Sequence, residues 1–139
     1  MMRKTKIAVG GVIIRDNKIL LTKRRDDPDK NKWAIPGGKL ELNETLEDGL
    51  KREMKEETSL NVKIGKLLGI IEVINDNFHY VILDYECDII SGEIEANSDA
   101  LDIGYFNLNG LSNVNETTLN FIREISKGIF PVSIINRND

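Results

Sequence analysis

The sequence predicts a single α/β (α+β) domain in which a mixed β-sheet lies between helical layers. Two observations carry this prediction. One group of β-rich segments precedes a central helical segment and a second group follows it, and an amphipathic helical segment comes near the C-terminal end. Strand groups on both sides of a helix favour a sheet with helices packed on its faces. A length of 139 residues suits one compact domain, so we expect a single domain over residues 1–139.

The strands are indicated by short runs rich in β-branched and aromatic residues that end at polar turns. Before the central helix, two strands joined by a tight turn are expected, and the apolar segment "WAIPGG" ends in a further turn. After the helix come three more β-rich segments. The expected strands have the sequences "KIAVGGVII", "ILLTKR", "NVKIGKLLGIIEVI", "FHYVILDYECDII" and "LDIGYFNL".

Two helices are expected. The first runs from about Thr45 to Thr58, because Thr45 can cap its start and Asp48, three residues later, forms a pair typical of a capping box. The second lies in "NETTLNFIREISKGI", where apolar residues follow helical spacing. These apolar positions are Leu119, Ile122, Ile125 and Ile129.

Composition limits the classes of partner. The net charge of −4 gives no general attraction to nucleic acid or to anionic membranes, so neither is expected as a partner. The N-terminal apolar run is too short to span a bilayer. Cys87 is the only cysteine, which excludes an intrachain disulfide and is compatible with a reducing compartment. We therefore expect a cytoplasmic protein.

The central helix gathers carboxylates on one side. On a helical wheel of about 100° per residue, Glu53, Glu56 and Glu57 fall in one arc beside the apolar stripe. Like charges this close destabilise a helix, and a divalent cation would offset the repulsion. Ligands that are all oxygen atoms suit Mg²⁺ or Mn²⁺. Arg52 lies four residues before Glu56 and can also hold that carboxylate.

An ordinary solvated charged face is the alternative reading of these carboxylates, and Gly49 weighs against it. A glycine inside a helix costs roughly 1 kcal/mol relative to alanine. Its missing side chain would let another group approach the carboxylates, or would let the helix pack tightly on a strand or loop. Both interpretations of Gly49 place the acidic arc in a crowded site.

The segment from Gly38 to Leu60 resembles the Nudix box of the Nudix hydrolases. The box begins with a glycine, which is followed after five intervening residues by a glutamate. Seven further residues separate that glutamate from an Arg-Glu pair, an aliphatic residue and one residue of any type. The box then ends with Glu-Glu, one residue of any type, a glycine and an aliphatic residue. The matching positions are Gly38, Glu44, Arg52, Glu53, Met54, Glu56, Glu57 and Leu60. One position departs, because Ser59 replaces the glycine that ends the helix in a left-handed conformation.

The resemblance implies the Nudix fold, an α/β/α sandwich with a mixed sheet. It also implies metal-dependent hydrolysis of a nucleoside diphosphate linked to another moiety, with Mg²⁺ (or Mn²⁺) as cofactor. Catalytic roles are implied for Glu53, Glu56 and Arg52, and for Glu44, which would orient the cluster behind Arg52. The implied metal site consists of Glu53, Glu56, Glu57 and Gly38. Later acids could instead serve as the general base; these are Glu93, Glu95 and Asp99.

The resemblance leaves two classes of substrate as alternatives. ADP-ribose or a related nucleoside diphosphate sugar is favoured, and a damaged or surplus nucleoside triphosphate is the alternative. A nucleotide sensor without turnover is the competing class, although such domains usually lack box carboxylates that this chain keeps. Candidate substrate-binding residues are Arg24, Arg25, Trp33 and Lys39. The family also suggests a homodimer.

Overall fold

The computed structural model describes residues 4–137. Its elements follow in chain order: β1 (Lys6–Val12), β2 (Ile14–Arg15), β3 (Lys18–Arg24), β4 (Trp33–Ala34), β5 (Gly37–Lys39), α1 (Leu46–Thr58), β6 (Asn61–Ile74), β7 (His79–Ser91), β8 (Ala100–Asn107), α2 (Glu116–Ile125) and β9 (Val132–Arg137).

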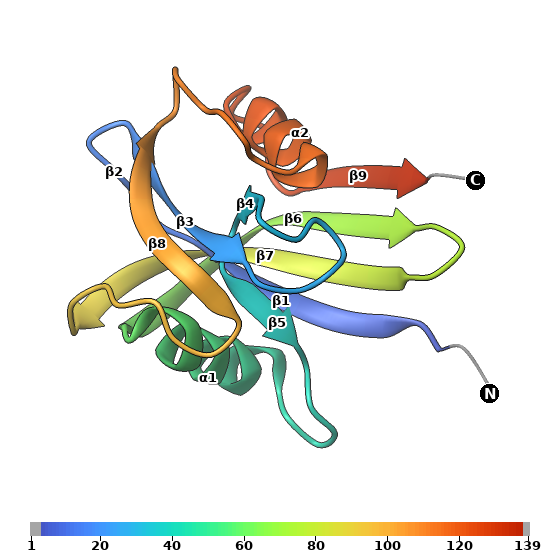
Figure 1. Cartoon of the computed structure of the whole chain (residues 1–139), viewed down its shortest axis with the longest axis horizontal. Helices are drawn as coiled ribbons and strands as arrows, with labels where there is room; N and C mark the ends of the chain where they lie inside the picture. Colours follow the sequence, from blue (N-terminus) through green and yellow to red (C-terminus); the bar gives the residue numbers. More distant parts are fainter. Residues whose placement is uncertain (1–3, 138–139) are drawn as a thin grey trace.

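The main sheet is mixed and has five strands in the order β5-β1-β7-β6-β9. β1 runs parallel to β7 and β9 runs parallel to β6, while the remaining neighbours are antiparallel. Helix α1 lies on one side of this sheet and α2 on the other (Figure 1). The expected α/β fold, with a mixed sheet between helical layers, is confirmed.

A second, antiparallel sheet was not expected from the sequence. β3 pairs with β2, β4 and β8. The pairing of β3 with β8 joins segments about 80 residues apart, for example Leu20 with Tyr105. A local residue pattern indicates a strand but does not identify such a distant partner, so the division into two sheets was missed.

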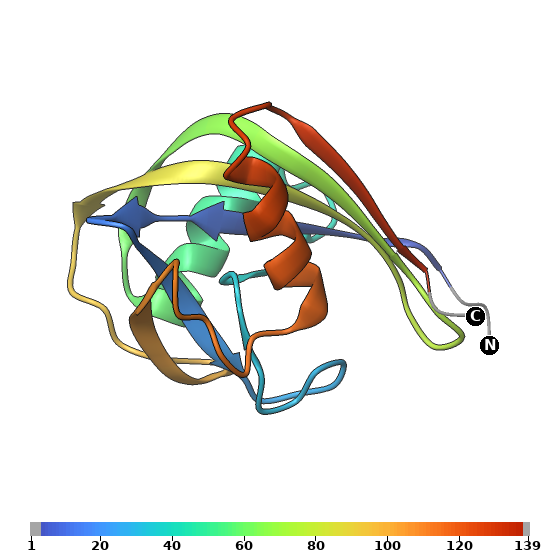
Figure 2. The same cartoon turned by 90° about the horizontal axis from the view of Figure 1, so that it is seen from above.

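The apolar residues form two clusters that match the two sides of the main sheet. The cluster beneath α1 contains Val9, Leu50 and Met54, all at most 1% exposed. The cluster beneath α2 contains Ile71 and Phe121, which are equally buried. The β6–β7 hairpin extends beyond both helices, beside β1 and β9 (Figure 2). No helix among residues 4–137 is long and apolar enough to cross a membrane.

The C-terminal segment differs from expectation in two respects. α2 ends at Ile125, so Ile129 is not part of its apolar face and is 72% exposed. Gly128, with φ of 77°, turns the chain after the helix, in a conformation that favours glycine. β9 then pairs with β6, and its six residues were not recognised as a strand.

Candidate active site

Helix α1 carries the acidic arc in the predicted orientation. The Thr45 side chain caps the helix by accepting a hydrogen bond of 3.0 Å from the Asp48 amide. Leu50 and Met54 are fully buried and fix the rotation of the helix against the sheet. The Glu53 side chain is consequently 15% exposed and the Glu56 side chain 50% exposed, which places the arc at the border of the core.

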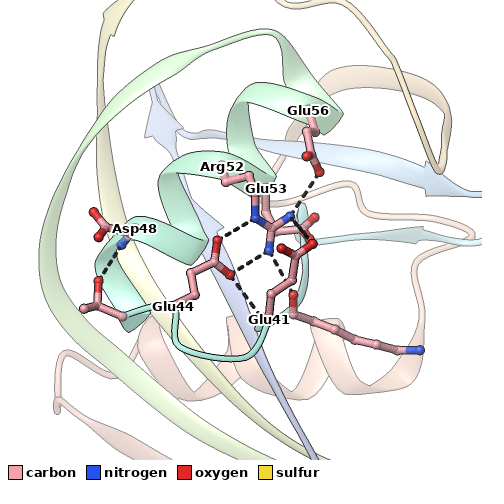
Figure 3. Close-up of polar contacts among 8 residues, drawn as sticks. Glu41, Glu44, Asp48, Arg52, Glu53 and Glu56 are labelled. Carbon is pink, nitrogen blue, oxygen red and sulfur yellow. Dashed lines mark hydrogen bonds and ion pairs between the residues drawn. The ribbon is translucent and has the colours of Figure 1, made fainter.

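Arg52 is the centre of an ion-pair network (Figure 3). Its Nε donates to Glu44 Oε2 at 2.6 Å and its Nη2 donates to Glu44 Oε1 at 2.8 Å. Its Nη1 donates to Glu53 Oε1 at 2.9 Å and to Glu56 Oε2 at 3.1 Å. Nη2 also donates to the Lys39 carbonyl at 3.2 Å. One guanidinium therefore positions three of the box carboxylates, as the sequence led us to expect for Glu44 and Glu56.

This network fixes the charges of its two best-paired members. The bidentate hydrogen bonds from Arg52 lower the pKa of Glu44 to about 2. The same contacts raise the pKa of Arg52 above its ordinary value, so the guanidinium stays protonated. Glu44 and Arg52 thus form a fixed ion pair beside Glu53 and Glu56.

Glu53 and Glu57 are held in a different environment. Burial raises the pKa of Glu57 to about 7, against the opposing effect of a 2.8 Å hydrogen bond from the Gly37 amide to its Oε2. Burial also raises the pKa of Glu53, while its contacts with Arg52 act in the other direction. Both carboxylates are therefore poorly solvated and would be stabilised by a nearby cation.

Two glycines make room for the carboxylates. A Cβ added at Gly38 would lie within 2.7 Å of Glu53 Oε1, so the Glu53 carboxylate occupies the space over that glycine. A Cβ at Gly49 would lie 2.5 Å from Leu40 Cδ1 and 2.9 Å from Glu44 Oε1. The absent side chain of Gly49 therefore leaves room both for the Leu40 side chain from the preceding loop and for the Glu44 carboxylate. Close packing and the approach of a carboxylate, the two interpretations of this glycine, thus apply together.

The donor chemistry fits a hard divalent cation. Glu53, Glu56 and Glu57 offer only carboxylate oxygens, and the Gly38 backbone lies against Glu53. Across residues 4–137, no three carboxylate, imidazole or thiol side chains converge as a ready-made metal site. Arg52 and the Gly37 amide hold these oxygens instead. The half-exposed Glu56 side chain is the one with most freedom to turn toward a cation.

Helix α1 ends as the resemblance implied, although serine stands at the position of the glycine. Ser59 adopts a left-handed conformation with φ of 69°, and its amide donates to the Lys55 carbonyl. Its hydroxyl also donates to the Glu95 carbonyl at 3.3 Å and accepts a hydrogen bond from Asn97 Nδ2. The serine therefore ties the helix end to the loop between β7 and β8.

That loop carries the later acids proposed as alternative bases. Asp99 accepts a 2.6 Å hydrogen bond from Arg25 Nη2, and its charge contributes to the raised pKa values of Glu53 and Glu57. Glu95 is tied through its backbone, because its amide donates to the Thr58 carbonyl at 3.0 Å. Of the three later acids, Asp99 is the one whose charge reaches the box carboxylates.

The four proposed substrate-binding residues differ in their contacts and in their relation to the acidic site. The positive charge of Arg24 acts to lower the pKa of Glu57, so Arg24 belongs to the site electrostatically. Arg25 is instead paired with Asp26 and Asp99. Trp33 is half-buried, with its ring centroid 4.5 Å from that of Phe106. Lys39 is exposed, with Nζ 5.9 Å from the centroid of the Tyr80 ring.

Sequence reasoning missed Asp84, a buried acid on β7. Asp84 is 5% exposed, and burial raises its pKa to about 7. The available signal was its position within the apolar run "YVILDY", where an aspartate is expected to be buried with its neighbours. Cys87, on the same strand, is buried as expected, and burial raises the pKa of its thiol to about 12.

Comparison with protein families matches residues 4–124 to the NUDIX domain. The chain is 42% identical over 107 residues to an ADP-ribose pyrophosphatase of Methanocaldococcus jannaschii, covering 76% of this chain and 63% of that protein. It is also 42% identical over 72 residues to an 8-oxo-dGTP diphosphatase of Escherichia coli, covering 51% of this chain and 56% of the relative. The chain thus spans less than two thirds of either relative.

Solved structures show the same architecture. A MutT NUDIX hydrolase of Burkholderia pseudomallei superposes with a TM-score of 0.82 at 27% identity, covering 88% of this chain and 99% of that one. A MutT protein of Methanosarcina mazei Go1 also gives 0.82, at 19% identity, with 92% and 97% covered, and shows the fold alone.

Proposed function

This chain belongs to the NUDIX domain family, and from that premise we propose that it hydrolyses the diphosphate bond of a nucleoside diphosphate derivative. The observation that carries the proposal is the Arg52 network, in which one guanidinium holds the carboxylates of Glu44, Glu53 and Glu56 together. Such an arrangement repels a free diphosphate, so it suits hydrolysis only together with divalent cations.

Glu53, Glu56 and Glu57, with the Gly38 backbone, would hold Mg²⁺ or Mn²⁺. A cation bound there would neutralise the diphosphate and polarise its phosphoryl oxygens. The chain's own residues supply the remaining work. Arg52 and Glu44 hold the carboxylates in a fixed geometry, and burial leaves Glu53 and Glu57 poorly solvated.

In the proposed reaction, a water oxygen attacks phosphorus in line, and the bond from phosphorus to the bridging oxygen breaks. A general base takes a proton from the water. Glu53 and Glu56 remain candidates for the base, and Asp99 is the candidate favoured among the later acids because its charge reaches the site. Arg24, whose charge acts on Glu57, would contact the phosphates.

We favour ADP-ribose or a related nucleoside diphosphate sugar as the substrate, on the similarity to the archaeal ADP-ribose pyrophosphatase. A nucleoside triphosphate is the second candidate, on the similarity to an 8-oxo-dGTP diphosphatase over a shorter segment. A sensor without turnover is less well supported, since Arg52, Glu53, Glu56 and Glu57 are all retained. A homodimer and a cytoplasmic location stay predictions.

A turnover assay over a nucleotide panel tests this function. Purified protein is mixed with ADP-ribose, nucleoside diphosphate sugars and nucleoside triphosphates, with Mg²⁺, Mn²⁺ or EDTA. We expect hydrolysis with either metal and none with EDTA, and kcat/KM at least about 10-fold higher for the preferred class. Turnover that is unaffected by EDTA, or no turnover of any member of the panel, would contradict the proposal.

A further inference from the structure

Asp84 is a buried carboxyl group whose hydrogen-bonding capacity is unused. Within residues 4–137 its carboxyl makes no hydrogen bond or ion pair, and its residue is only 5% exposed. No fully buried side-chain oxygen or nitrogen in this part of the chain lacks a partner. The unpartnered Asp84 oxygens must therefore keep contact with space that solvent can reach.

The position of Asp84 relates it to the acidic site. In the main sheet, Asp84 on β7 lies opposite Gly10 on β1, and Gly10 lies opposite Gly37 on β5. The Gly37 amide is the donor that holds Glu57. Since neighbouring strands are about 4.8 Å apart, the backbone of Asp84 lies roughly 10 Å from that of Gly37.

The carboxyl group leans along this row toward β5, on the sheet face opposite α1, because it is at the next residue of β1, Gly11, that an added Cβ would meet Met54 of that helix. Its Oδ1 occupies the space that a Cβ of Gly10 would need, so the Asp84 side chain reaches over β1 in the direction of β5. Ile35, which follows β4, forms an apolar wall against the same space. Figure 1 shows β7 between β1 and β6, in the middle of the sheet.

A buried carboxyl group without partners destabilises the fold, and a leucine would fill a similar volume without that cost. A ligand that presents two adjacent hydrogen-bond donors would satisfy both oxygens at once. A nucleoside linked through a diphosphate places its base, or its second sugar, several bonds from the reacting phosphorus. A recognition group two strands away from Gly37, whose amide holds Glu57, matches that spacing.

We propose that Asp84 is a specificity-determining residue that accepts two adjacent hydrogen-bond donors of the substrate, remote from the diphosphate. This inference rests on the proposed function for the substrate class. The donors could belong to the amino–imino edge of a purine base or to the vicinal hydroxyls of a second ribose. The two sources share the same chemistry and can be separated by experiment.

The test measures equilibrium binding with Mg²⁺ and with α,β-methylene analogues of the ligands named below, in which carbon replaces the bridging oxygen of the diphosphate and hydrolysis is blocked. Wild type and Asp84→Asn are titrated by calorimetry with two ligand pairs. GDP is compared with IDP, which lacks the 2-amino group, and ADP-ribose is compared with ADP, which lacks the second ribose. Asp88→Asn is the matched control, because Asp88 lies on the same face of β7 and is exposed. Asp84→Leu is a second variant, which suits the apolar surroundings.

We expect wild type and Asp88→Asn to bind one donor-bearing ligand about 10- to 100-fold more tightly than its partner. In Asp84→Asn and Asp84→Leu this preference should fall below about 3-fold. The responding pair identifies the source of the donors. Equal preferences in wild type and the Asp84 variants, no preference in either pair, or no binding of any ligand would overturn the inference. Selective binding without turnover in the metal-containing assay would contradict only the proposed function.

Discussion

The Arg52 guanidinium donates two hydrogen bonds to the Glu44 carboxylate, of 2.6 Å from Nε and 2.8 Å from Nη2. Planar bidentate pairing of this kind needs the fork of an arginine, and a lysine ammonium cannot reproduce it. Because the same guanidinium also reaches Glu53 and Glu56, the pair is the support on which the proposed metal ligands rest.

Arg52→Lys should therefore lower kcat by about 10- to 100-fold while the protein remains folded. The positive charge stays, but the carboxylates lose their common geometry. The Glu44 carboxyl, whose pKa is now about 2, should titrate closer to its ordinary value, which NMR would detect. Lys55→Arg, on the exposed face of the same helix, is the control and should leave kcat unchanged. Equal kcat values for wild type and Arg52→Lys would show that the carboxylates do not need the Arg52 guanidinium to hold them in place.

Glu57→Gln should lower turnover by at least about 10²-fold and raise the thermal midpoint measured without metal. The rate falls because a proposed ligand loses its charge, and stability rises because a poorly solvated carboxylate is removed. Glu56→Gln should lower turnover by a similar factor. Glu47→Gln, on the exposed first turn of α1, should change neither quantity much. Full activity of either variant at Glu56 or Glu57 would exclude that residue from the metal site.

Gly49→Ala should lower kcat by about 10-fold or more. Alanine adds roughly 1 kcal/mol of helix propensity, but the new methyl group would displace Leu40 and the Glu44 carboxylate. A small displacement of a positioning residue is enough to slow catalysis. At Gly110 an added Cβ would meet nothing within 4 Å, so Gly110→Ala is the matched control. An active and stabilised Gly49→Ala would show that Glu44 tolerates the shift.

The pH dependence of stability should reveal the buried Asp84 carboxyl. Its pKa is raised from 3.8 in the unfolded chain to about 7 in the fold. Between these values the unfolded chain releases a proton that the folded chain retains, so stability falls as pH rises from about 4 to about 7. Below about pH 4 both states are protonated, and above about pH 7 the full cost is present.

Asp84→Asn should accordingly be more stable than wild type by about 2–4 kcal/mol at pH 8, and by much less at pH 4. Glu57 titrates in the same range, so the measured quantity is the difference between the two unfolding free energies at each pH. Denaturant unfolding between pH 4 and pH 8 provides it. A difference that does not grow with pH would mean that Asp84 is ionised and solvated throughout this range.

The sequence predicted the parts of the site that depend on neighbours along the chain. The Thr45 cap, the buried Leu50 and Met54, and the contact of Arg52 with Glu56 all follow from helical spacing, and the structure confirms them. The left-handed end of the helix at Ser59 was also predicted, through the resemblance.

The parts that the sequence did not predict depend on contacts between distant segments. The environment of Asp84 is made by Gly10 and Ile35, which lie 74 and 49 positions earlier, and the hydrogen bond from Gly37 to Glu57 joins a strand to a helix. The strand β9 is recognised only through its pairing with β6. Periodicity reports which face a residue occupies, but tertiary packing decides what that face meets.

Hydrolysis should break a bond between phosphorus and oxygen. The proposed ligands would bind cations at a diphosphate, so the attacked atom should be phosphorus, and the base and sugar should contribute binding energy. Hydrolysis in ¹⁸O-labelled water should place the label in a product phosphate and leave glycosidic bonds intact. ADP-ribose should give AMP and ribose 5-phosphate, and a triphosphate should give the monophosphate and pyrophosphate. Mass spectrometry of the products measures the label, and Glu57→Gln is the control for background hydrolysis. Label on a sugar carbon, or release of free base by wild type above that background, would show attack at carbon and would contradict the proposed role of Glu53, Glu56 and Glu57 in binding cations at the diphosphate.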